Sequence, residues 1–415
     1  MKSFLKITAW AIGCIILLLG ITAILYFSNP QKFEAKVYDA FYPRVKNTEK
    51  FSGKALIEIP EVYELMWIAC SLTETFQKDE NLTSAPEEFP DYHQAIQQQF
   101  QAHQDHPLIQ KLDSYFNDGA YGLAHYAIRF LSLNYDLDEN GRLRKMGDYK
   151  VSGILTKVFK KYAFLIPEHK ALINDFVEKT DFKSFYQNHQ DFYNELTQNY
   201  QDLAELDEMW KWLEMRYPNR INSYRIFCSP LTGGFHNTMS FAGKGDFEQA
   251  LMFVNAPPQD LTNISDSALV KVKAGYSRIV FTEIDHNYVN PLSETYRAEI
   301  AAAIPDYSFW NNASQGYKSS HNTFLEYMTF GMYSLFAKTQ FEEQWEYDLA
   351  IQRLENMMES YRGFYRFSEF NQELIHYYEH TNSPEDMDAL YQHMIKWMGN
   401  YTQASSSAKA ASLKH

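Results

Sequence analysis

The sequence is poor in cysteine and in basic residues. Only three cysteines occur in 415 residues, and two of them, Cys70 and Cys228, lie beyond the first 30 residues. These two either form one disulfide or stay as buried free thiols. The 38 lysines and arginines are outnumbered by 52 aspartates and glutamates, which gives a formal net charge of −14. Because phosphate binding needs a basic surface, this excess of acid excludes nucleic acid as a partner.

The composition otherwise is that of a folded protein. Apolar residues make up 45% of the chain and aromatic residues 16%, which is enough to build a substantial core in one large domain or two ordinary ones. The 30 tyrosines and 30 phenylalanines fit wide helix-packing surfaces, or a groove for peptide or sugar, without distinguishing them. Disorder of the whole chain is therefore excluded.

The N-terminus carries the single long apolar run. Lys2 and Lys6 precede an uncharged stretch from Ile7 to Phe27, close to the roughly 20 residues that cross a bilayer. We interpret residues 1–29 as a membrane anchor, with a cleaved signal peptide and a lipoprotein signal at Cys14 as alternatives. Positive charge before the run keeps the N-terminus in the cytoplasm, so we expect the rest of the chain in the periplasm or outside the cell.

The remainder divides by pattern into four segments. Residues 30–50 read as a polar linker, and residues 51–217 as a mainly helical subdomain that begins with a short strand at Lys54–Pro60. Residues 218–400 start with two strands, Ser223–Ser229 and Ala250–Asn255, separated by turn-rich segments, and continue as helices. Residues 401–415, rich in Ser and Ala, are predicted to be disordered.

The most informative stretch is Tyr276–Pro291, with the sequence YSRIVFTEIDHNYVNP. At about 100° per residue, Val280, Phe281, Ile284 and Tyr288 share one helix face, and Thr282, Glu283, His286 and Asn290 share the other. Asp285 points away from the second face. Because proline disfavours helical backbone in the residue before it, the helix is predicted to end at Asn290.

This stretch resembles the active-site helix of a zincin. HExxH there places two histidines on zinc, with the glutamate as general base, whereas this chain has Thr282 in place of the first histidine. The string FTEIDHNYVNP, followed forty residues later by FLEYMTFGMYSLF, is similar to a bacterial family of uncharacterised function with exported or membrane-anchored members. Its gluzincin-like pattern is HEFxHxxxNP followed by EY, and the resemblance covers most of residues 50–380.

The resemblance implies roles for three residues. His286 and Glu326 would be zinc ligands, and Glu283 the general base. With Thr282 a site of His286 and Glu326 is one ligand short of the usual three. Glu283 could supply the missing ligand, since Glu-x-x-His also binds metals on helices, but it would then be lost as a base.

Two further motifs compete with this one. His376 to His380 spell HxxEH, the inverted zincin motif, but only 35 residues follow it, too few for the expected downstream acidic ligand, so we interpret it as a surface helix. The segment DLDENG (136–141) imitates the start of an EF-hand loop, yet Gly147 stands where the bidentate glutamate belongs. An Asn-Gly hairpin turn is the preferred interpretation.

The sequence thus predicts a mainly helical α+β protein of zincin-like fold, with a small antiparallel sheet before the helix that carries Glu283 and His286. The first functional hypothesis is an envelope-anchored metallopeptidase-like hydrolase that acts on a peptide or protein presented by the strand Ala250–Asn255. The second is a catalytically inactive zincin-like domain that binds peptide, glycan or an envelope protein. A helical scaffold in which His286 is merely hydrogen-bonded is the third.

Overall fold

The computed structural model describes residues 44–78, 84, 86–117, 121–150, 164–234, 236–261, 263–314 and 316–412, without the side chains of 121–126 and 405–412. The expected membrane anchor, residues 1–29, and most of the linker lie outside these ranges. Within them, no helix combines the length and the apolar content that crossing a membrane requires.

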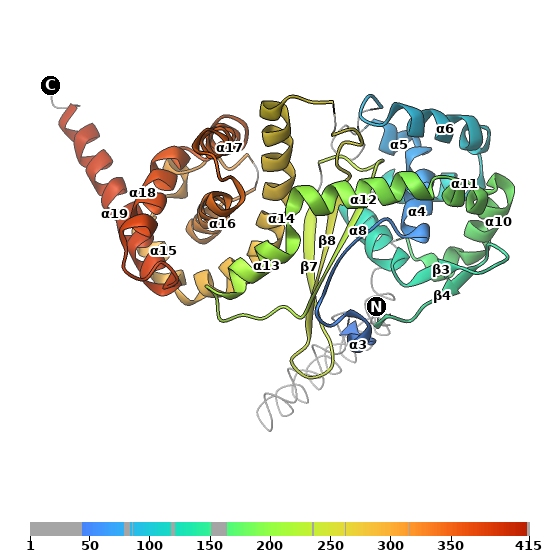
Figure 1. Cartoon of the computed structure of the whole chain (residues 1–415), viewed down its shortest axis with the longest axis horizontal. Coiled ribbons are helices and arrows are strands. Elements are labelled where there is room, and N and C mark those ends of the chain that lie inside the picture. Colours follow the sequence, from blue (N-terminus) through green and yellow to red (C-terminus); the bar gives the residue numbers. More distant parts are fainter. Residues whose placement is uncertain are drawn as a thin grey trace, which may run out of the picture.

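The chain is mainly helical around one larger sheet. Figure 1 places this sheet in the middle of the molecule, with the blue-to-green helices on one side and the orange-to-red helices on the other. The helices before the last strand are α3 (Thr48–Phe51), α4 (Glu61–Ser71), α5 (Glu74–Gln77), α6 (Pro90–Phe100), α7 (Pro107–Asn117), α8 (Tyr121–Ser132), α10 (Lys170–Thr180), α11 (Phe182–Asn188), α12 (Gln190–Ala204) and α13 (Leu206–Glu214). Those after it are α14 (Asp266–Thr295), α15 (Arg297–Ala303), α16 (Ser320–Gln340), α17 (Gln344–Asn356), α18 (Phe367–His380) and α19 (Met387–Ser412).

The larger sheet is mixed and has six strands in the order β2-β6-β8-β7-β1-β5. The strands are β1 (Arg44–Val45), β2 (Lys54–Glu58), β5 (Tyr149–Lys150), β6 (Ser223–Ser229), β7 (Asn237–Ala242) and β8 (Glu248–Asn255). β2, β6 and β8 are mutually parallel, and β7 is antiparallel to β8. Every residue of β6 is buried, as expected for a parallel strand covered on both faces.

This sheet corrects the expected small antiparallel one. The two predicted strands are present as β6 and β8, but they run parallel, and β7 lies in the segment that was interpreted as turns. β2 joins β6, so the sheet also combines strands from both sides of the boundary drawn at residue 217. The two-stranded antiparallel sheet is a separate hairpin of β3 (Tyr135–Leu137) and β4 (Leu143–Lys145).

Helix α4 forms the centre of the core beside the sheet. All nine residues from Val62 to Cys70 are buried, which is the pattern of a helix enclosed on all sides. Cys70 and Cys228 are both buried free thiols, which settles the alternative left open by the sequence. Burial raises the pKa of both thiols far above the usual range, so they are unreactive core residues.

Helix α14 is longer than predicted and contains Pro291 in its interior. A proline lacks the N–H that would bond the carbonyl four residues earlier, here that of Asn287. The side-chain amide of Asn219 lies 3.5 Å from this carbonyl and donates to it in place of the missing N–H. The prediction that the helix ends at Asn290 was therefore wrong, because a residue from another part of the chain compensates for the proline.

The C-terminal helices pack beyond α14. α16 is buried along most of its length and packs against both α14 and α18. A π-helical turn, Met357–Tyr361, connects α17 to the loop before α18. The backbone of α19 stays helical to Ser412, so it includes most of the segment 401–415 for which disorder was predicted; alanines there favour helix.

Candidate functional site

The two faces predicted for α14 are present in the structure. Val280, Phe281, Ile284 and Tyr288 are fully buried against the core. Glu283 and His286 are partly buried on the other face, and Asn290 is exposed. The packing of α14 on α16 brings this polar face towards Glu326, a buried residue in the second turn of α16.

The imidazole of His286 and the carboxylate of Glu326 face each other across the two helices. His286 Nε2 lies 3.9 Å from Glu326 Oε1, and the side chain of Glu326 is only 5% exposed. The other carboxylate oxygen, Oε2, accepts a hydrogen bond of 2.6 Å from Arg362 Nη2. Arg362 therefore fixes the carboxylate with one oxygen directed towards His286.

A neighbour on the same helix orients the His286 ring. His286 Nδ1 lies 3.2 Å from Asn290 Oδ1. An amide oxygen only accepts hydrogen bonds, so Nδ1 carries the proton in the neutral ring. Nε2 is then left with a lone pair directed at the space beside Glu326, which is the arrangement of a metal-binding imidazole.

Glu283 completes this group without contacting either partner. No hydrogen bond or ion pair to its carboxylate is found among the described residues. Desolvation raises the pKa of Glu283, and the negative charge of Glu326 adds to this, while a protonated His286 or the charge of Arg362 opposes it. A partly buried carboxylate with a raised pKa and no partner is suited to accept a proton.

Thr282 takes no part in this convergence. Its hydroxyl donates a hydrogen bond of 2.9 Å to the carbonyl of Arg278, one turn earlier on the same helix, and the residue is 6% exposed. Asp285 is fully buried on a different side of the helix, and His321 pairs with Glu294 instead. None of these three side chains is a further donor for the site.

The donors at His286 and Glu326 meet a simple distance test for zinc. Bonds of about 2.1 Å require two donor atoms on one ion to lie within about 4.2 Å of each other, and the observed separation is 3.9 Å. The described residues contain no group of three His, Cys, Asp or Glu side chains arranged around a common point. The residues therefore fit a two-ligand site, short of the usual three.

Strand β7 runs beside this part of α14. Ser240 Oγ donates a hydrogen bond of 2.6 Å to Asn287 Oδ1, the residue after His286. In the described chain, the edge of β7 away from β8 is paired only at Ala242, with Arg44 of β1. β8 itself is paired on both edges, by β6 and β7, so the prediction that the strand Ala250–Asn255 presents a substrate was wrong.

Several basic residues around the site were not identified from the sequence. Arg362 reaches Glu326 from the turn after the π-helix, where Gly363 adopts a left-handed backbone with φ 71°. Arg278 lies two turns before His286 on α14. Arg129, from α8, also lowers the pKa of Glu283, but its influence on that pKa is smaller than those of burial, His286, Glu326 and Arg362. Only the irregular turn signalled by Gly363 could have suggested one of these positions.

The competing motifs form no comparable site. His376 and His380 are exposed at the end of α18, where their rings pack 4.2 Å apart and His380 Nδ1 bonds the carbonyl of His376. The intervening Glu379 pairs with Lys338 instead. In the β3–β4 hairpin, the carboxylate of Asp138 accepts backbone bonds from the turn, which confirms the Asn-Gly turn.

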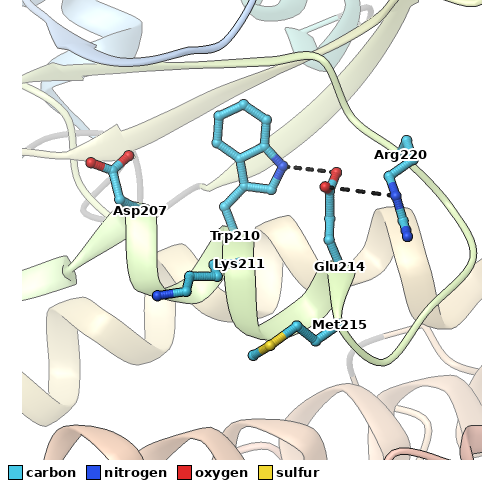
Figure 2. A pocket seen from close by; sticks show the side chains of 6 residues that line it. All are labelled: Asp207, Trp210, Lys211, Glu214, Met215 and Arg220. Carbon is cyan, nitrogen blue, oxygen red and sulfur yellow. Dashed lines mark hydrogen bonds and ion pairs between the residues drawn. The ribbon is translucent and has the colours of Figure 1, made fainter.

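An open hollow of about 430 Å³ lies beside α13, away from these residues (Figure 2). Three of its polar groups pair with one another: Glu214 accepts a hydrogen bond of 2.9 Å from the indole of Trp210 and lies 3.9 Å from Arg220. The hollow is open and holds no histidine or cysteine among its lining residues, so we assign it no function.

Comparisons with known proteins give a family and no activity. A family model described as a domain of unknown function, DUF4932, matches residues 57–396. No curated protein and no solved structure matches the chain.

Proposed function

We propose that this chain, which belongs to the DUF4932 family of unknown function, is a zincin-like metallohydrolase acting on peptides, with a zinc site weakened by the loss of one ligand. The observation that carries the proposal is the convergence of His286 and Glu326 from two helices beside Glu283, whose carboxylate has no hydrogen bond or ion pair among the described residues. His286 through Nε2 and Glu326 through Oε1 would hold Zn²⁺.

The proposed role of each residue follows from the surroundings of its side chain. Zinc, when bound, supplies a Lewis acid that polarises the substrate carbonyl and lowers the pKa of water. Glu283 accepts the proton of the attacking water, helped by the desolvation that raises its pKa. Arg362 holds Glu326 in position, and Asn290 holds the His286 tautomer that leaves Nε2 unprotonated.

The free edge of β7 supports a peptide as substrate. Residues Asn237–Phe241 have no partner strand on that side within the described chain, and the strand contacts α14 next to His286. An extended peptide can add to such an edge through main-chain hydrogen bonds. Its carbonyls would then pass the polar face of α14.

A catalytically inactive peptide-binding domain is the second candidate. The observation in its favour is the hydroxyl of Thr282, which is occupied by the carbonyl of Arg278 and takes the place of an imidazole. Without a third ligand, metal affinity falls and the hydrolytic chemistry can be lost while the groove remains.

We further propose, from the sequence alone, that residues 7–27 anchor the protein in the membrane with the folded part outside the cytoplasm. The apolar length and the preceding Lys2 and Lys6 support this. Fusing alkaline phosphatase, which is active only outside the cytoplasm, after residue 415 tests it: an inactive fusion contradicts the orientation.

Zinc binding and peptide cleavage should be measured on the same purified full chain. We compare the wild type with Glu283→Gln, Glu326→Ala and Thr282→His, and use Glu299→Gln on exposed α15 as the control for loss of a carboxylate. The hydrolase proposal is supported if Glu326→Ala loses zinc while the other variants keep it, and if Glu283→Gln loses peptide cleavage although it still binds zinc.

The other outcomes separate the two candidates. Zinc bound only by Thr282→His, together with no cleavage by the wild type, supports the inactive domain. A second imidazole, as the third protein ligand, should raise zinc affinity by more than the roughly 10- to 100-fold attributed to outer-shell partners. No zinc in any variant, Thr282→His included, refutes both the metal site and the zincin-like interpretation of α14.

A further inference from the structure

A group of two arginines and one histidine lies at the end of the site nearest the start of α14. Arg278 comes from α14, Arg129 from α8, and His236 from the loop just before β7. The pKa of His236 falls to about 4 through burial and then through the positive charges of Arg278 and Arg129. The two arginines therefore lie close to the same ring, in a protein whose formal net charge is −14.

Two of these three groups have polar partners. Arg129 Nη1 donates a hydrogen bond of 2.6 Å to Asn237 Oδ1, the first residue of β7. His236 Nε2 lies 3.0 Å from Asn255 Oδ1, at the end of β8. Their positions are thus fixed by the sheet.

Arg278 differs from both. Within the described part of the chain its guanidinium has no hydrogen bond and no ion pair, and its one described contact is with the ring of Phe330, 6.0 Å away. The same ring lies 4.8 Å from the guanidinium of Arg362. Burial, with the nearby charges of Arg362 and Arg353, lowers the pKa of Arg278 to about 10, so it stays positive at neutral pH.

Arg278 is partly exposed, so its guanidinium can be reached by a ligand. The guanidinium of Arg362 beside the same ring adds repulsion, because the two like charges share one neighbour. A bound anion would relieve this repulsion and would form charge-assisted hydrogen bonds with Arg278.

The positions of α14 and β7 indicate where that anion belongs. Arg278 and His286 lie eight residues apart on the helix, about 12 Å along its axis and roughly 80° around it. β7 covers a similar length, from Asn237 beside Arg129 to Ser240 beside Asn287, about 10 Å. A peptide extended along β7 would therefore pass Glu283 and His286 and reach Arg278 at one end.

We propose that Arg278 binds a carboxylate of an extended peptide that lies along the edge of β7 left without a partner strand by the described residues. The carboxylate is either the C-terminus of the peptide or an acidic side chain, since both present the same two oxygens to a guanidinium. This inference rests on the proposed peptide groove and names its substrate class, but it does not depend on zinc.

Isothermal titration of the full chain with three synthetic peptides tests the inference. The probes are an N-acetylated octapeptide of Ala, Ser and Tyr as the free acid, the same peptide as the C-terminal amide, and the amide with one internal Glu. Titrations run in EDTA, so that cleavage does not occur and the result is independent of metal. The variant is Arg278→Gln, and Lys271→Gln, an exposed cation on the same helix, is its matched control.

The free acid or the Glu-containing amide should bind at least about 10-fold more tightly than the plain amide, as expected for one charge-assisted hydrogen bond. Arg278→Gln should abolish this preference, and Lys271→Gln should keep it. Which of the two acidic peptides is preferred identifies the source of the carboxylate.

Equal affinity for all three peptides, or no binding of any of them, overturns the inference. Thermal unfolding provides the second readout: Arg278→Gln should melt at or above the wild-type temperature, because it removes an unpaired charge. A clear drop in melting temperature would show that Arg278 has a structural role instead. If the carboxylate preference is found but no variant binds zinc, the peptide site stands and the hydrolase proposal fails.

Discussion

The buried carboxyl group of Glu64 makes the stability of this protein depend on pH. Glu64 lies on α4 with none of its surface exposed, and its Oε1 accepts a hydrogen bond of 2.6 Å from the hydroxyl of Tyr92. Desolvation outweighs this hydrogen bond and raises the pKa of Glu64 from 4.5 to about 7. We expect Glu64→Gln, which keeps the shape and the acceptor oxygen but cannot ionise, to stabilise the protein above neutral pH.

The sign and size follow from proton linkage. Because the folded-state pKa lies above the unfolded one, the native protein keeps its proton between pH 4.5 and about 7 while the unfolded chain has lost it. The wild-type free energy of unfolding therefore falls as pH rises through this window and is level above it. At about 1.4 kcal/mol per pH unit, the total loss is on the order of 3 kcal/mol.

Urea denaturation of wild type and variant at pH 4.5 and pH 8 measures this effect. The free-energy difference between Glu64→Gln and wild type should increase by about 3 kcal/mol from the lower to the higher pH. Glu139→Gln, which changes an exposed glutamate in the β3–β4 turn, should follow the wild type at both pH values. Parallel pH dependence of Glu64→Gln and wild type would refute the reasoning.

Two further substitutions test the packing around the site. Asp285 is fully buried with no described hydrogen bond to either carboxylate oxygen, and burial raises its pKa well above the usual value. Asp285→Asn should therefore raise the free energy of unfolding, measured by urea denaturation, more at pH 8 than at pH 4. An equal change at both pH values would contradict this. At Gly363, with φ 71°, a Cβ would lie 2.0 Å from the side-chain amide of Asn312, whereas at Gly245, with φ 69°, it would meet nothing within 4 Å. Gly363→Ala should cost more in urea denaturation than the roughly 1–2 kcal/mol expected for Gly245→Ala from backbone strain alone, and equal costs would contradict the contact.

The helical periodicity of α14 was readable from the sequence, but its length was not. Four apolar positions at helical spacing identified the buried face, because the side of a helix that is buried follows mainly from the spacing of apolar residues in its own sequence. The end of the helix depended on Asn219, which lies far away in sequence and bonds the carbonyl that Pro291 leaves unpaired. No local rule contains that contact.

The sheet was predicted in part for a similar reason. The apolar runs of β6 and β8 identify buried strands, whereas β7 follows glycines and carries polar residues such as Thr238 and Ser240 on its partly exposed surface. Whether β6 and β8 run parallel to each other depends on where β7 lies in the sheet, and this is determined by the packing of the whole chain. The β3–β4 hairpin was predicted correctly because its signal, Asn140-Gly141, lies within the turn itself.

The candidate site combines local and distant information. The stripe of Glu283 and His286 is visible in the sequence, and the resemblance to a zincin pattern suggested Glu326 as its partner. Arg362 was not predictable, because a π-helical turn and a left-handed glycine set its approach. Arg278 was visible as a charge, but only the packing of α14, α16 and β7 shows that no anionic side chain pairs with it among the residues that the structure describes.

The central claim is that His286 and Glu326 converge on one zinc ion. Its most direct test is the zinc content of the full chain after dialysis against micromolar zinc, measured for the wild type, His286→Ala, Glu326→Ala and Thr282→His. We predict zinc bound weakly by the wild type, tightly by Thr282→His, and not at all when His286 or Glu326 is replaced. Zinc retained in both alanine variants, or absent from Thr282→His, would contradict the claim.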